Sequence, residues 1–294
     1  MKLIGIALVF IMTFGGFMLA GGKIKIITGV ILPAIPGESL IILGTAVAAF
    51  IIANSSSTIK HTIKSLSALT SPTVYTKESY IELLCLMFTV FKLARTKGWL
   101  ALEQHIENPD DSDMFSQFPE FHNNEHALYF VCDYLRIISL GNENPHELEA
   151  LMDEEIETLS HEYLEPSHAV QTMADGLPAL GIVAAVLGVI KTMASITEPP
   201  EVLGKLIGSA LVGTFLGVWL SYGFAAPIAG AMKGKAENQI MYFKCIKSGI
   251  LAFLQGSAPQ VATEFARKLL PEELRPTFLE LEEAINELPT TTTS

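Results

Sequence analysis

Hydrophobic and charged positions fall into long separate blocks along this chain. Charged side chains are almost absent from residues 3–59 and 176–232, and they crowd the stretches between and after these two blocks. A helix needs about 20 mostly apolar residues to cross roughly 30 Å of hydrocarbon. The pattern therefore predicts membrane-spanning helices in the two apolar blocks and aqueous segments elsewhere.

Four apolar runs are candidate membrane spans. They are Leu3–Gly22, Pro36–Ala53, Gly176–Ile190 and Leu206–Met232, the last with 27 residues and no charge. The first run is longer than the apolar region of a signal peptide and lacks its small-residue cleavage pattern, which favours a span over a cleaved leader. Residues 198–201 predict a tight break between the last two spans. With four spans, both chain ends lie on the same side of the membrane.

The second span is predicted to begin at Pro36, a residue suited to the first position of a helix. Glu38 then lies in the first turn, where the helix dipole favours an anion. On this interpretation no ionisable residue lies near the centre of any span. Because a proton or cation path normally needs an ionisable group within the membrane, the chain alone is predicted to be unable to relay protons.

Lysines near the span ends predict the orientation. Seven flank one side of the predicted membrane and two to four flank the other, so the side with seven is assigned to the cytoplasm. The three cysteines fall on that side, as free thiols do in a reducing compartment, and their spacing is not that of metal ligands. They are Cys85, Cys132 and Cys245.

Residues 54–171 are predicted to form a helical cytoplasmic domain. They contain 19 acidic and 7 basic residues, which argues against nucleic acid as a partner. Apolar side chains recur there with the period of amphipathic helices, and no alternating strand pattern is present. The predicted helices are Tyr80–Ala94, Ala127–Leu140 and Leu148–Leu164.

Overall, we expect an all-α membrane protein with four transmembrane helices. Residues 1–53 and 172–235 each hold two spans joined by a short periplasmic loop, and residues 236–294 form a cytoplasmic helical region with a disordered Thr-rich tail. Composition agrees, since half of the residues are apolar, 17% are charged and the mean hydropathy is +0.40. A soluble protein has about 25% charged residues.

The sequence contains no enzyme motif of three common kinds: a Gly-rich phosphate-binding loop, a nucleophile elbow or a zinc-protease helix. No cofactor or metal is therefore expected, and the chain is not predicted to be an enzyme. His122 and His126 have the spacing of ligands one helical turn apart, although solvated positions explain them better.

Small residues line the last two spans and predict close helix contact. They include Gly181 and Gly188 in the third span and the GxxxG pair Gly213 and Gly217 in the fourth. Thr214 either bonds back to its own helix or lines a water path. Pro178 and Pro227, one in each span, are either ordinary packing kinks or parts of a hinge.

This arrangement resembles the MotA family of flagellar stator subunits over essentially the whole chain. The similar segments are Leu177–Gly188, Val212–Gly217, Ser221–Phe224 with Pro227, Glu149–Glu157, Gly98–Pro109 and Glu280–Glu283. The resemblance implies a homo-oligomer in the bacterial inner membrane, around a MotB-like single-span partner that supplies an intramembrane Asp. Such a complex would use ion flow to turn the rotor.

The resemblance also implies roles for individual residues. Arg95 and Glu103 match the charged residues that contact the rotor protein FliG, with an intrachain salt bridge as the alternative interpretation. Pro178 and Pro227 match the prolines tied to conformational coupling, and Thr214 matches a hydroxyl lining the ion path. Sodium-driven relatives carry a second hydroxyl where Ala185 stands here, which favours protons over sodium.

Two other functions remain open at this point. One is an energy-transducing subunit of the ExbB/TolQ type, against which four spans and the Arg95/Glu103 segment argue. The other is a non-conducting membrane scaffold whose acidic domain recruits soluble proteins, which fits the lack of a charge in the predicted spans.

Overall fold

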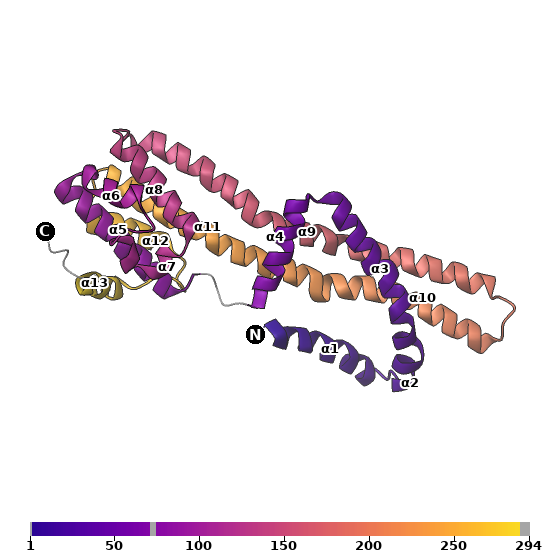
Figure 1. Cartoon of the computed structure of the whole chain (residues 1–294). Helices are drawn as coiled ribbons and strands as arrows, with labels where there is room; N and C mark the ends of the chain where they lie inside the picture. The colour runs from indigo at the N-terminus through magenta and orange to yellow at the C-terminus, as the bar shows by residue number, and fades with distance from the viewer. Residues whose placement is uncertain (1, 71–74, 289–294) are drawn as a thin grey trace. The chain divides into compact units, whose positions relative to one another are not determined.

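The computed structural model describes residues 2–70 and 75–288, and within these ranges the chain forms helices and no strand. It divides into two compact units, whose helices are labelled in Figure 1. The first comprises Met1–Pro72 and Leu164–Gly234, and the second comprises Thr73–Tyr163 and Lys235–Ser294. The predicted disordered tail, residues 289–294, lies outside the described residues.

The first unit holds the apolar helices. Three helical stretches are long and apolar enough to cross a membrane: Ile24–Ala53, Pro145–Ala194 and Pro200–Leu254. The helix α1 (Lys2–Leu19) is apolar and has 18 residues, or about 27 Å at 1.5 Å per residue, slightly less than the hydrocarbon thickness. Its inner face packs through Phe10 and Phe14 on Trp219, whose Nε1 donates to Thr13 Oγ1 at 3.0 Å.

The predicted start of the second span is wrong. Its helix begins at Ile24 and runs through α2 (Ile24–Ile26), a π-helical segment η1 (Ile27–Ile31) and α3 (Leu32–Ala53). Pro36 lies inside α3 rather than at its start. Glu38 is therefore in the middle of a span, not in its first turn.

The last two spans extend into long continuous helices. The predicted helix Leu148–Leu164 and the predicted third span are parts of one 50-residue helix, α9 (Pro145–Ala194), with Pro166 and Pro178 inside it. The predicted break is confirmed, since α10 (Pro200–Leu220) begins at Pro200. Through the π-helical segment η5 (Ser221–Ala225) α10 continues into α11 (Ala226–Leu254).

A short amphipathic helix that sequence reasoning missed follows the second span. This helix, α4 (Ser56–Ser67), is capped by Ser55, whose side chain accepts from the N–H of Thr58. The Thr58 hydroxyl donates to Glu165 Oε1 of α9 at 2.9 Å. The contact attaches α4 to α9 within the first unit.

The second unit packs helices around an aromatic core. It contains α5 (Lys77–Lys97), η3 (Trp99–Leu102), α6 (Glu103–Glu107), η4 (Phe115–Gln117), α7 (Pro119–His122), α8 (Glu125–Ser139), α12 (Pro259–Leu269), α13 (Phe278–Glu287) and the remaining parts of α9 and α11. Tyr80, Phe91, Tyr134, Tyr242 and Phe243 are almost fully buried. Because α7 ends at His122 and a new helix begins at Glu125, His122 and His126 are not on one helix.

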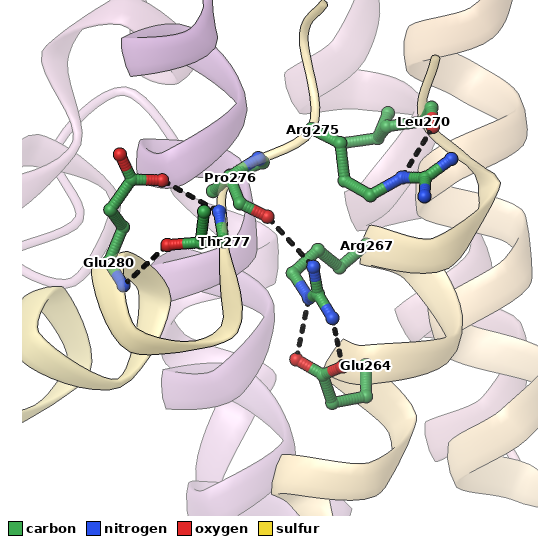
Figure 2. A network of polar contacts seen from close by, with 7 residues as sticks. All are labelled: Glu264, Arg267, Leu270, Arg275, Pro276, Thr277 and Glu280. Atoms are coloured by element: carbon green, nitrogen blue, oxygen red, sulfur yellow. Dashed lines mark hydrogen bonds and ion pairs between the residues drawn. The ribbon is translucent and has the colours of Figure 1, made fainter. Parts of the chain in front are cut away.

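Polar contacts hold the connection between α12 and α13 (Figure 2). Buried Arg267 forms a bidentate pair with Glu264, both distances being 2.7 Å, and donates to the carbonyl of Pro276 at 2.8 Å. Glu280 closes a capping box with Thr277 and pairs with Lys77 of α5 at 2.7 Å. These bonds lower the pKa of Glu280 to about 2.

All three cysteines are free thiols and are buried in the second unit. Burial raises the pKa of Cys85 to about 11 and that of Cys132 to about 12. A half-buried carboxylate, Glu82 of α5, accepts a hydrogen bond from the backbone N–H of Phe121 in α7 at 2.9 Å. Its burial raises the pKa of Glu82.

Candidate functional site

Glycines bring α9 and α10 into backbone contact. A Cβ atom added at Gly217 would lie 2.6 Å from the carbonyl oxygen of Leu177 and 2.7 Å from the Cα of Gly181. At Gly188 an added Cβ would lie 2.7 Å from the Cβ of Ala210. Since real Cβ atoms essentially never approach other atoms within 3.0 Å, only glycine fits at these positions. The predicted close contact of the third and fourth spans is confirmed.

This contact brings the two predicted ion-path residues close together. An added Cβ at Gly213 would lie 3.0 Å from the backbone nitrogen of Ala185, and Thr214 follows Gly213 in the chain. Among the described residues the Thr214 hydroxyl has no hydrogen-bond partner, whereas Thr192 of α9 donates to the carbonyl of Gly188 at 2.9 Å. Thr214 thus does not bond back to its own helix in the described structure.

The third element of the site is Glu38 of α3, which sequence reasoning placed at a helix start. Its Oε2 atom is buried and has no hydrogen-bond partner among the described residues. The same oxygen lies 2.7 Å from the position that a Cβ of Gly213 would occupy. A carboxylate oxygen of Glu38 therefore fills the space that Gly213 leaves beside the backbone of Ala185, and the expectation that the spans lack a central ionisable group is wrong.

The two predicted coupling prolines are linked through Ser221. Pro178 has no N–H, so the carbonyl of Ala174 four residues earlier loses its helical donor. The buried Ser221 hydroxyl replaces that donor at 2.7 Å. Ser221 also opens the π-helical segment η5, where its carbonyl accepts from the N–H of Ala226, directly before Pro227. One side chain of η5 thus satisfies the carbonyl that Pro178 leaves without a helical donor in α9.

Arg95 and Glu103 lie on the surface of the second unit. Arg95 is in the last turn of α5, which ends at Gly98 with φ +81°, and Glu103 opens α6 after the turn η3. Both are exposed, and within the described ranges neither forms an ion pair. The alternative interpretation, an intrachain salt bridge between the two, is therefore not observed.

Comparison with known proteins identifies the family. Residues 3–98 match the family model of the motility protein A N-terminal region, and residues 124–245 match that of the MotA/TolQ/ExbB proton channel family. Motility protein A of Salmonella typhimurium is 41% identical over 283 residues, which cover 96% of this chain and 94% of the relative. The chain belongs to the motility protein A family. Another relative, chemotaxis protein LafT of Vibrio parahaemolyticus, is 33% identical over 97% of this chain and 98% of its own length.

Solved structures of the motility protein A family have the same fold. The structure of MotAB from C. jejuni matches with a TM-score of 0.73 and 20% identity, covering 94% of this chain and 98% of that one. The flagellar MotAB stator complex from Bacillus subtilis matches with a TM-score of 0.69 and 26% identity, covering 92% and 95%. The predicted all-α fold class is thereby confirmed.

Proposed function

We propose that this chain is a stator subunit of the bacterial flagellar motor and forms, with a MotB-like partner, a complex that converts proton flow into rotor torque. The observation that carries the proposal is the likeness to motility protein A along nearly the whole chain. The match of residues 3–98 to the motility protein A N-terminal model favours a motor subunit over an ExbB/TolQ-type transporter.

The residues at the contact of α9 and α10 support protons as the translocated ion. Sodium needs several oxygen ligands to replace its hydration shell, and Ala185 offers none beside Thr214. A proton needs only a carboxylate and a hydrogen-bonded route, which an intramembrane Asp of the partner and the free Thr214 hydroxyl would supply. Each charge moved down about 100 mV releases about 2.3 kcal/mol for mechanical work.

The prolines and the surface charges have separate roles in this mechanism. Pro178 and Pro227 would let α9 and α10 bend as the partner's carboxylate gains and loses its proton. Arg95 and Glu103, which are exposed and unpaired in the described structure, would contact the rotor protein FliG from the cytoplasmic side of the inner membrane. Several copies of the chain would surround the partner.

Complementation of a motility-deficient strain tests the proposal. A strain lacking both stator genes receives this chain with its one-span partner, or this chain alone, and swimming is recorded in sodium-free buffer before and after a protonophore. We expect motility only with both genes and its loss with the protonophore. Motility that requires sodium would refute the choice of ion, and no rescue by the inserted pair would refute the motor function.

Reversing both surface charges tests the contact with the rotor. Replacing Arg95 by Glu and Glu103 by Arg should lower torque and stator recruitment, while the amount of complex in the membrane stays unchanged. Reversal of Lys268 and Glu272, which are exposed and form no ion pair among the described residues, is the matched control. Equal effects of the two reversals would contradict the proposed contact.

A further inference from the structure

Glu38 occupies the middle of a membrane-spanning helix. The helical stretch Ile24–Ala53 has 30 residues, so Glu38 lies about 20 Å along the helix axis from either end. A charged side chain near the centre of a bilayer is costly, and such residues usually mark ion or proton pathways. The position alone sets Glu38 apart from the carboxylates of the aqueous domain.

Within the part of the chain that the structure describes, Glu38 forms no ion pair. Oε2 is buried and without a hydrogen bond among the described residues, and it faces the backbone of Gly213. Lys191 lies in the last turn of α9. Glu201 and Lys205 lie in the first turns of α10, and Lys23 and Lys25 lie where the helix containing Glu38 begins.

A lone carboxylate in this setting gains from binding a proton. Protonation removes the charge and with it most of the cost of burial. Because Gly213 has no side chain, the Glu38 carboxyl group reaches the backbone where Gly213 of α10 contacts Ala185 of α9. A carboxyl group that gains and loses a proton at this depth in the membrane is suited to exchange protons with water there.

We propose that Glu38 is a second proton-binding site of the stator, contributed by this chain, which takes up and releases the translocated proton at its contact with Gly213, the residue before Thr214. Uptake forms an O–H bond at the carboxylate and converts a hydronium ion to water. Release to water or to the partner's carboxylate reverses the step, so no co-reactant is consumed. The inference rests on the proposed motor function and adds an acid that the partner does not supply.

A torque–speed measurement on single motors tests this role. Glu38→Gln removes the titration but keeps the size and polarity of the side chain, Glu38→Asp keeps the titration, and Glu201→Gln removes an exposed carboxylate at the start of α10. A positioned proton-transfer group contributes at least about 100-fold to its step, so we expect Glu38→Gln to lower the speed at low load at least about tenfold. Stall torque, which reflects the energy per ion, should persist. Glu38→Asp should retain most of the speed, and Glu201→Gln should match the wild type.

Three results would overturn the inference. A rotation speed of Glu38→Gln equal to that of the wild type at low load, at every external pH, would exclude a role in proton transfer. Equal loss of stall torque and membrane level in Glu38→Gln and Glu38→Asp would make the residue purely structural. If Glu38→Gln does not assemble, infrared difference spectra between low and high pH are recorded for the purified wild-type and Glu38→Asp complexes. A titrating carboxyl band at the same frequency in both complexes belongs to another residue and would overturn the inference.

The wild-type control separates this inference from the proposed function. If the wild-type pair restores rotation and the Glu38 variants behave as the wild type, only the role of Glu38 fails. If the wild-type pair gives no rotation, the proposed function fails, and the inference fails with it.

Discussion

Replacing Gly217 by alanine should force α9 and α10 apart. The new Cβ would lie 2.6 Å from the carbonyl oxygen of Leu177 and 2.7 Å from the Cα of Gly181. Carbon atoms in contact prefer about 3.5–4.0 Å, so the helices must separate by about 1 Å. Because the obstructing atoms belong to the backbone, no rotamer change can relieve the clash.

The magnitude follows from two opposing effects. Overpacking costs about 1–3 kcal/mol, and alanine recovers up to about 1 kcal/mol of helix propensity relative to glycine. Because the obstructing atoms belong to the backbone, the cost lies near the upper end of its range, about 3 kcal/mol, and the net destabilisation is about 2 kcal/mol. The matched control is Gly204→Ala in the same helix, where an added Cβ has no atom within 4 Å and only the propensity gain applies.

Thermal unfolding of the purified complex, followed by tryptophan fluorescence, measures the difference. Gly217→Ala should lower Tm by about 5 °C, whereas Gly204→Ala should leave it unchanged or raise it slightly. Swimming speed should fall only in the first variant. A Gly217→Ala complex at least as stable as the Gly204→Ala complex would refute the backbone contact and the reasoning built on it.

Three other substitutions probe single contacts. Ser221→Ala leaves the Ala174 carbonyl without a donor and should cost about 1–3 kcal/mol in the same unfolding assay, whereas Thr192→Val, which removes a bond to a carbonyl already in the helix ladder, should cost less. Since burial raises the pKa of Glu82, ionisation of this carboxyl group destabilises the folded state. Glu82→Gln should therefore be at least as stable as the wild type at neutral pH, and the difference in stability between the two proteins should shrink as the pH falls. Glu280, with a pKa lowered to about 2, stabilises the fold above pH 4.5 and loses this effect as the pH falls toward 2, so Glu280→Gln should flatten that part of the stability–pH curve.

Periodic apolar patterns were sufficient to predict most helices of the aqueous part. The predicted helix Tyr80–Ala94 lies inside α5, and the predicted helix Ala127–Leu140 extends one residue beyond the end of α8. Both could be predicted because their buried residues repeat at helical spacing. The helix α12 was missed because Ala262 and Ala266 form its buried face, and alanine gives a weak apolar signal. The continuity of α9 was missed because Pro166 and Pro178 normally argue for a helix end.

The site was only partly accessible from local patterns. The small residues around Gly181 and Gly217 predicted helix contact because spacing alone indicates a smooth face. Glu38 was misplaced because a charge near a proline suggests a boundary, although the apolar residues from Ile24 onward could have indicated an earlier start. The bond between Ser221 and Ala174 joins residues 47 positions apart, and no local pattern reports such a contact.

The buried thiols have a practical consequence for labelling. Only the thiolate reacts with maleimides and similar reagents, and with a pKa of about 11 the Cys85 side chain is ionised to about one part in 10,000 at neutral pH. Cys132 and Cys245 are equally shielded by their neighbours. The native protein therefore serves as an unreactive background, and one new cysteine in place of an exposed residue such as Arg95 would carry a fluorophore or a crosslinker without prior removal of the natural three.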